Sequence, residues 1–207
     1  MNSNLQNMDD PKVTFSTSEL SLMMNSEFIL TKNRVISNIY ELFGSLSTAL
    51  VSEVESNAPA WVEQVSGSPK ISKGEQYQGF PWVMLDYPRI FSREKGFLAL
   101  RTFFWWGHYF TAQWLISGSF YSKLNIAIKT KGWPFMINGC QLYAGFSSNP
   151  WINELPQEGI LCLEAADLSE EGFPDGVFKL AIKVPINQWT NIPDNVLALC
   201  KLILEGE

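Results

Sequence analysis

Histidine is the residue that this 207-residue chain has least of, with only His108. A single histidine excludes every metal site built from several histidines. A Ser-His-Asp arrangement would have to use His108, and no G-x-S-x-G segment supplies its serine. The chain also has no phosphate-binding G-x-x-x-x-G-K-[ST] loop and no G-x-G-x-x-G fingerprint, so the sequence predicts no cofactor.

Cysteine is scarce as well. Cys140, Cys162 and Cys200 are odd in number, far apart in sequence and without a C-x-x-C pair. This pattern argues against both a disulfide framework and a thiolate zinc site. We expect three reduced, mostly buried thiols, as is usual in the cytoplasm.

The chain has no overall excess of basic residues. Its formal net charge is −6, whereas a duplex nucleic-acid binder needs a cationic surface. The charge is uneven, because residues 79–150 carry a net +5 and both flanking parts are acidic. We interpret this as a core sheet complemented by acidic elements, with no nucleic acid as a partner.

No convincing membrane segment is present. Residues 102–122 are uncharged over 21 positions, but they include His108 and Gln113, which are costly in a bilayer. A central strand explains this stretch better. Residues 1–11 also lack the charged and apolar regions of a signal peptide. The sequence therefore predicts a cytoplasmic protein without a membrane partner.

The first part of the chain is predicted to be helical over residues 16–66, after a poorly ordered segment 1–15. Ser16-Thr-Ser-Glu19 is a capping-box pattern. Residues 31–57 have apolar side chains at helical spacing, which predicts one long amphipathic helix. These side chains are Ile36, Ile39, Phe43, Leu46, Leu50 and Val54. We expect the stripe to pack on the chain's own sheet.

The polar segment 67–79 is predicted to be a loop, and residues 80–190 to be rich in strands. Residues 80–87 are apolar on both faces, and Pro88 is expected to close that strand. Between residues 98 and 117 apolar and polar positions alternate without losing phase at Gly107. This favours one long strand bent at Gly107, and two strands joined at Trp106-Gly107 are the alternative.

Residues 122–131 fit a short helix slightly better than a strand. Residues 140–144 and 160–165 are predicted as short strands, and residues 177–184 as a strand with Lys179 and Lys183 facing outwards. A last helix is expected over 194–205. The predicted class is α+β, a single domain over 16–207 with a largely antiparallel sheet on which the N-terminal helices and the C-terminal helix pack.

Five residues are candidates for a binding site. His108, beside the glycine that bends the strand, is either a ligand contact or a hydrogen-bonded core histidine. Asp86 and Arg89 flank Pro88, and Arg101 is on the next strand. One carboxylate with two guanidinium groups can bind an anion or fix a strand corner. Trp105 shares a face with Arg101 and is the best candidate among the many aromatic residues for lining a pocket.

Several segments together resemble an uncharacterised bacterial protein family of about this length. They are GFPWVMLDYPRIF, ALRTFFWWGHYF, the SG that follows, and the NPW loop. The resemblance covers residues 28–205. It implies a single domain and no assigned activity or site residues.

The function hypothesis is a non-catalytic cytoplasmic domain that binds a small ligand or a protein partner. One alternative is a small enzyme that uses His108 with Asp86 and Arg89 or Arg101 on an anionic or planar substrate. Another is a structural subunit of a homodimer formed through the N-terminal helical stripe. Because every catalytic motif is absent, the first hypothesis is favoured.

Overall fold

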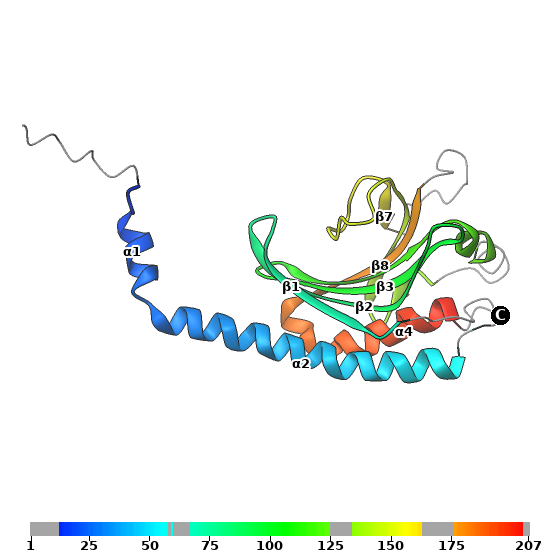
Figure 1. Ribbon diagram of the computed structural model, residues 1–207, viewed down its shortest axis with the longest axis horizontal. Helices are drawn as coiled ribbons and strands as arrows, with labels where there is room; N and C mark the ends of the chain where they lie inside the picture. The colour runs from blue at the N-terminus through cyan, green and yellow to red at the C-terminus, as the bar shows by residue number, and fades with distance from the viewer. Residues whose placement is uncertain (1–12, 58, 60–66, 125–133, 163–175, 205–207) are drawn as a thin grey trace, which may run out of the picture. The chain divides into compact units, whose positions relative to one another are not determined.

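A computed structural model describes residues 13–57, 59, 67–124, 134–162 and 176–204 (Figure 1). Its contacts divide the chain into two compact units, residues 1–38 and 39–207. The expected poorly ordered segment 1–15 lies mostly outside the described residues. Residues 13–15 are exposed and have no regular secondary structure.

The first unit contains α1 (Thr17–Met23) and the beginning of α2 (Ser26–Asn57). The predicted capping box is present. The backbone N–H of Glu19 donates to Ser16 Oγ at 3.2 Å, and the N–H of Ser16 donates to Glu19 Oε2 at 2.7 Å. These bonds satisfy amides that have no partner within the helix, so they fix where α1 begins.

The second unit has the predicted α+β fold, with helices on one face of an antiparallel sheet (Figure 1). All six apolar residues of the stripe predicted for α2 are buried. The ring of Phe43 on α2 contacts that of Phe110 at 6.4 Å between centroids. The indole N–H of Trp114 donates to the carbonyl oxygen of Leu199 on α4 (Ile192–Leu204). The helical spacing of the apolar residues of α2 therefore matches their burial.

Eight strands make up the sheet, in the spatial order β1-β2-β3-β4-β8-β6-β5, with β7 pairing with β6. Each paired neighbour is antiparallel. Their bounds are β1 Lys70–Tyr77, β2 Phe80–Ser92, β3 Gly96–Trp105, β4 Tyr109–Ile116, β5 Met136–Ile137, β6 Cys140–Ser147, β7 Ile160–Cys162 and β8 Val177–Pro185. A 3₁₀-helix, η2 (Ile186–Asn191), leads from β8 into α4.

The single bent strand favoured for residues 98–117 is wrong. β3 and β4 are two strands of a hairpin, joined by a three-residue turn in which Gly107 has a φ of 74°. Trp105 pairs with Tyr109, so residues of equal parity face each other across the hairpin. A turn with an odd number of residues keeps the alternation in phase, which is why the pattern concealed it.

The loop predicted for residues 67–79 is also wrong, because residues 70–77 form β1 at one edge of the sheet. Its polar and charged side chains are typical of edge strands, which avoid pairing with other chains. Likewise, β2 does not end at Pro88. It continues to Ser92 after a shift of register between Asp86 and Arg89.

Other predictions are confirmed in part. Residues 119–124 are helical, and the remainder of the ambiguous segment 122–131 lies outside the described residues. β7 replaces the strand predicted for 160–165, of which residues 163–165 are not described. β8 and α4 agree with the predictions to within two residues at each end. None of the three cysteines, which all lie in the described ranges, is in a disulfide, and Cys140 and Cys200 are buried.

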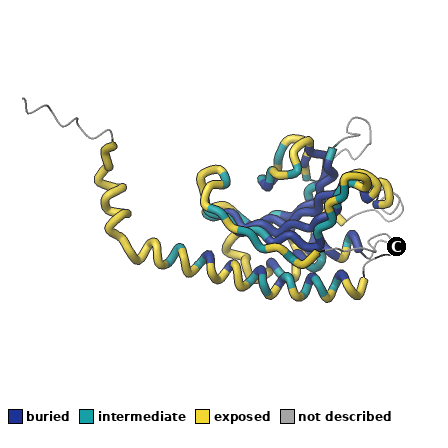
Figure 2. Tube along the Cα trace, viewed as in Figure 1, coloured by how far each residue is buried: buried dark blue, intermediate teal, exposed yellow. Residues whose placement is uncertain are grey.

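The register gives the sheet two different faces. Phe104, Phe110 and Leu180 share the face that α2 and α4 cover. The opposite face carries Arg101 and Gln113, which are paired neighbours on β3 and β4. Figure 2 shows that the central strands are buried along most of their length. Both faces are therefore shielded from water, although only the first is apolar.

Candidate functional site

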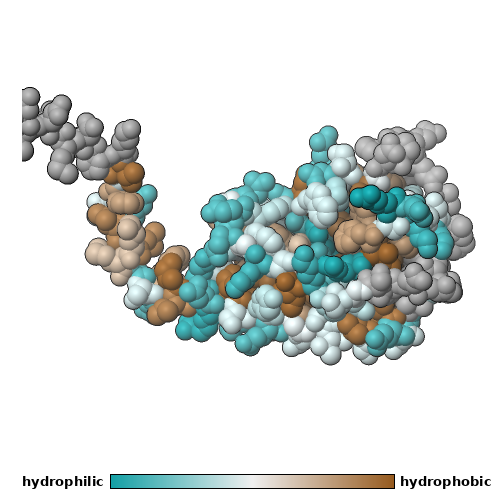
Figure 3. Space-filling view, viewed as in Figure 1, coloured by the Kyte–Doolittle hydropathy of each residue, from teal (hydrophilic) through white to brown (hydrophobic). Residues whose placement is uncertain are grey.

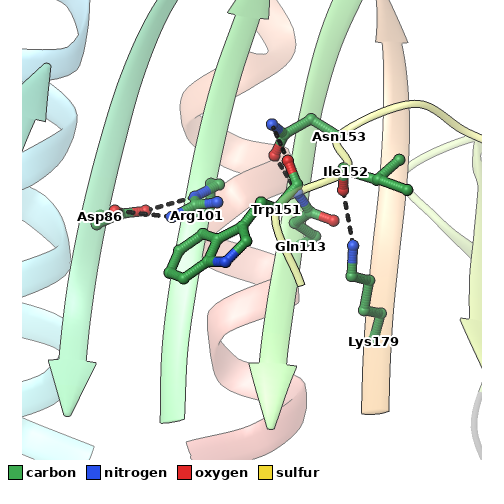
Figure 4. A network of polar contacts seen from close by, with 7 residues as sticks. All are labelled: Asp86, Arg101, Gln113, Trp151, Ile152, Asn153 and Lys179. Carbon is green, nitrogen blue, oxygen red and sulfur yellow. Dashed lines mark hydrogen bonds and ion pairs between the residues drawn. The ribbon is translucent and has the colours of Figure 1, made fainter. Parts of the chain in front are cut away.

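A row of polar side chains crosses the sheet on the face away from the helices. Asp86, Arg101 and Gln113 are successive cross-strand partners on β2, β3 and β4, and Gln113 in turn faces Ala181 on β8. Lys179 is two residues from Ala181 and therefore on the same face. Figure 4 shows these side chains meeting the segment that carries Trp151, Ile152 and Asn153.

The carboxylate of Asp86 and the guanidinium of Arg101 form a bidentate ion pair. Arg101 Nε donates to Asp86 Oδ1 at 2.8 Å, and Arg101 Nη2 donates to Oδ2 at 3.1 Å. Only 6% of Asp86 and 3% of Arg101 is exposed. The indole of Trp151 covers the pair, with its centroid 5.2 Å from Arg101 Cζ. The charge of Arg101 is therefore neutralised within the protein.

Residues 148–157, here called the cover segment, lie over the polar row. Gln113 Nε2 donates to Asn153 Oδ1 at 2.6 Å, and Lys183 Nζ donates to the carbonyl oxygen of Leu155 at 3.2 Å. The backbone N–H of Leu155 donates to the Tyr109 hydroxyl. The segment, which has no regular secondary structure of its own, is thus held to the sheet by polar contacts and by the packing of Leu155 against Ala181 and Ile160.

Two glycines allow the chain to fold back at this point. A Cβ on Gly145 would lie 2.0 Å from the carbonyl oxygen of Gly159, and one on Gly159 would lie 2.1 Å from that of Phe146. Only glycine permits so close a backbone approach. Gly145 is also the cross-strand partner of Lys179. The close approach of β6 and the residues before β7 therefore positions the cover segment above Lys179.

Within the cover segment, Glu154 is bound by Tyr77, the last residue of β1, and by Gln78, which follows it. The hydroxyl of Tyr77 donates to Glu154 Oε2 and accepts the backbone N–H of Asn153 at 2.8 Å. Gln78 Nε2 donates to Glu154 Oε1 at 3.2 Å. Burial and the nearby Glu154 carboxylate raise the pKa of Tyr77 well above its usual value. Both carboxylate oxygens of Glu154 are therefore occupied at the β1 edge.

Lys179 has the most unusual environment in the site. Its side chain is 0% exposed, and its amino group donates to the carbonyl oxygen of Ile152 at 2.7 Å. Burial, with the nearby charge of Arg101, lowers the pKa of Lys179 to about 8, and the carboxylate of Glu154 offsets part of this effect. An ammonium group has three N–H donors, and a buried charge is costly without a counterion. Within the described residues, this ammonium has one neutral acceptor.

Three further polar atoms on this face are buried and have no hydrogen-bond partner among the described residues. They are Trp105 Nε1, Thr111 Oγ1 and Gln113 Oε1. Unpaired buried polar atoms are uncommon in proteins, and each one lowers stability. The polar face therefore has several groups with fewer hydrogen-bond partners than they can bind, namely Lys179 and these three atoms. The ion pair of Asp86 and Arg101, by contrast, is bidentate.

Of the candidate residues from the sequence, only some are brought together. Asp86 and Arg101 are in contact, as the sequence suggested. Arg89 pairs with Ala99, so the register places it on the same face, beyond the irregularity in β2. Among the described residues it forms no ion pair. Trp105 is also on this face and only 7% exposed, four residues from Arg101.

His108 is not part of a bent strand, as the sequence analysis predicted, and it is not a core histidine. It is exposed in the turn between β3 and β4. Its ring stacks on Trp105, with 3.6 Å between centroids and 5° between planes, and Nδ1–H donates to the carbonyl oxygen of Trp106. Four residues of strand separate Trp105 from Arg101, about 13 Å at ~3.3 Å per residue. His108 therefore caps an aromatic cluster and does not join the polar row.

Sequence reasoning missed Lys179, Gln113 and Asn153. The alternation along β8 predicted an outward Lys179, but the cover segment buries it. Gln113 could have been found from the sequence. Paired residues on β3 and β4 are both odd-numbered or both even-numbered, so Gln113 lies on the same face as Arg101. Asn153 lies in the irregular cover segment, where no periodicity marks a side chain that will be buried.

Within the described ranges, no group of three or more His, Cys, Asp or Glu side chains could hold a metal ion. Among the helices in those ranges, none has both the length and the apolar character needed to cross a bilayer. No family model, curated protein or solved structure matches this chain, which is consistent with the resemblance to a family without an assigned activity.

Proposed function

We propose that this protein is a non-catalytic binding protein that takes a small carboxylate between the polar face of the sheet and the cover segment. The observation that carries the proposal is the environment of Lys179. Its buried ammonium group donates to one neutral carbonyl oxygen, and an anion there would supply a counterion in direct contact, which Glu154 does not provide.

The neighbouring charges support an anion in preference to a cation. Asp86 is already paired with Arg101, and Glu154 is bound by Tyr77 and Gln78. Lys179 and Lys183 both donate to backbone carbonyl oxygens of the cover segment. The face therefore has cationic groups whose acceptors are neutral, and a carboxylate is a stronger acceptor than a carbonyl.

The ligand would replace the carbonyl oxygen of Ile152 as the acceptor of Lys179. Residues 148–157 would then shift outwards, which their lack of regular secondary structure permits. Trp151, which is 58% exposed above Arg101, would shield the bound molecule. A hydroxyl group on the carboxylate would donate to Gln113 Oε1, an unpaired acceptor on the same face.

Binding without catalysis fits the chemistry of this site. A nucleophile and a general base must lie within hydrogen-bond reach of each other. The one histidine of the chain is in the β3–β4 turn and bonds to a backbone carbonyl. The three cysteine thiols are compatible with a reducing compartment, so the proposal includes a cytoplasmic location. It also includes the bacterial family that the sequence resembles.

Thermal unfolding with added acetate and glycolate tests the proposal. Either probe should raise the Tm of the full chain, because a ligand that binds only the folded state stabilises it. Glycolate should have the larger effect, since its hydroxyl can satisfy Gln113. Sodium chloride at the same ionic strength controls for salt.

The variant Lys179→Met should lose the response to both probes. Lys73→Met is the matched control, because Lys73 is an exposed lysine on β1 whose cross-strand partner, Val83, is buried. It should respond like the native protein. An equal Tm shift in Lys179→Met and native protein, or no shift in native protein at saturating probe, would refute a carboxylate site at Lys179.

A further inference from the structure

The N-terminal unit exposes an unusual amount of apolar surface. Between residues 13 and 30, nine large apolar side chains are at least two-fifths exposed (Figures 2 and 3). They are Val13, Phe15, Leu20, Leu22, Met23, Met24, Phe28, Ile29 and Leu30. We call these nine residues the N-terminal apolar surface. α1 has no buried residue at all.

Scattered exposed apolar residues are normal, but a continuous run of them marks an interaction surface. The local structure here is well specified, because the Ser16–Glu19 capping box begins α1 and Asn25 Oδ1 accepts the N–H of Phe28 at the start of α2. These contacts define α1 and the first turn of α2, whose apolar side chains remain exposed. A partner must therefore supply the burial that stabilises them.

The charges argue against a lipid surface as this partner. Helices that lie in a membrane interface carry lysine or arginine on their polar side. Residues 13–31 contain neither, and their two charged residues are Glu19 and Glu27. A protein surface with both apolar and basic groups is a better match.

The next turns of α2 provide such a surface. Lys32 and Arg34 follow the acidic stretch, so residues 19–34 have acidic groups first and basic groups last. If two copies of this segment lie antiparallel and cross near Leu30, Glu27 of each copy faces Arg34 of the other, because these two residues are two helical turns apart on one face. Charges flanking an apolar seam set the choice of partner and its direction. The segment is thus complementary to itself.

We propose that the occupant of the N-terminal apolar surface is a second copy of this chain, and that the beginnings of the two α2 helices pair antiparallel across Leu30, with Ile29 at the edge of the contact. α1 adds Leu20, Leu22 and Met23 to the same buried seam. This differs from the homodimer considered from the sequence, which used the stripe from Ile36 to Val54. That stripe is already buried within the chain.

Sedimentation velocity of the full chain over a range of concentrations tests the pairing. Native protein should sediment as a dimer, and Ile29→Glu/Leu30→Glu should sediment as a folded monomer with an unchanged circular dichroism spectrum. Leu161→Glu, at another exposed leucine on β7, is the control and should remain dimeric. A monomeric native protein, or a dimeric double variant, would overturn the proposal.

Charge reversal tests the identity and direction of the partner. Glu27→Lys and Arg34→Glu should each weaken the dimer several-fold, because each places like charges together twice in a symmetric pair. The double variant Glu27→Lys/Arg34→Glu should associate more tightly than either single variant. If it does not, the antiparallel arrangement is wrong. Binding of native protein to phosphatidylcholine vesicles with loss of the dimer would assign the surface to lipid and overturn the second copy.

Discussion

The two faces of the sheet are both covered, but by different means. On one face, α2 and α4 bury apolar side chains such as Trp114 and Phe43 through contacts that have helical periodicity. On the other, the cover segment meets Arg101, Gln113 and Lys179 through hydrogen bonds and one stacked indole. The first face accounts for the fold, and the second concentrates the groups that can bind a ligand.

The difference also concerns how completely each face is satisfied. Packing on the helical face is mainly apolar. The indole N–H of Trp114 has its acceptor there, whereas Thr102 Oγ1 on β3 and Asn195 Oδ1 on α4 have no partner among the described residues. The polar face keeps three buried atoms without partners and one ammonium with a single neutral acceptor. A protein selected only for stability would fill such positions with apolar residues, so polar groups retained at a cost are typical of functional sites.

The largest expected effects are losses of stability from one substitution on each face of the sheet. Asp86→Ala should lower the free energy of unfolding by about 3–5 kcal/mol, because it leaves the guanidinium of Arg101 buried and uncompensated. Phe43→Ala should cost a similar ~3–5 kcal/mol by creating a cavity. Urea unfolding of both variants, monitored by circular dichroism, measures these costs.

Only the polar loss should be recovered by a second change. Asp86→Leu/Arg101→Met replaces the ion pair with apolar side chains and should regain most of the stability that Asp86→Ala loses. If the double variant is as unstable as Asp86→Ala, the pair is needed for packing and the contrast between the faces fails.

A smaller effect is expected at the turn between β3 and β4. His108→Ala should lower the free energy of unfolding by less than about 1 kcal/mol, because the exposed ring contributes mainly its stacking on Trp105. Binding of glycolate should be unchanged, since His108 is remote from Lys179. Chemical denaturation and the Tm shift with glycolate measure the two quantities.

For this variant, a loss of several kcal/mol would mean that the turn organises the hairpin. A lost response to glycolate would instead return His108 to the site proposed from the sequence.

Sequence periodicity predicted the helical face well, because the stripe from Ile36 to Val54 records one environment along one element. It also brought Asp86 and Arg101 together, since both lie on neighbouring strands next to a recognisable turn. The alternation of apolar and polar residues over 98–117 could not reveal the turn, because a turn with an odd number of residues leaves that alternation unchanged.

Lys179 shows what local pattern cannot supply. Its position among alternating residues of β8 is that of a side chain facing water. Its burial depends on Ile152 and its neighbours, more than twenty residues earlier in the chain. The polar composition of β1 misled in a similar way, because an edge strand and a loop have similar residues and differ only in pairing.

Lys179 is a buried amino group with no carboxylate in hydrogen-bond contact among the described residues, and the pH dependence of stability tests this directly. Its pKa is about 8 in the folded protein and near 10.5 when exposed. Below pH 8 both states are protonated. Between pH 8 and 10.5 the unfolded state binds more protons, so the free energy of unfolding should rise with pH.

The measurement compares native protein with Lys179→Met by urea unfolding from pH 7 to 10, so that the difference between the two curves isolates Lys179. Native protein should gain about 2–3 kcal/mol relative to the variant over this range. Saturating glycolate should abolish the gain by holding the ammonium charged. Parallel curves for the two proteins without ligand would contradict the claim.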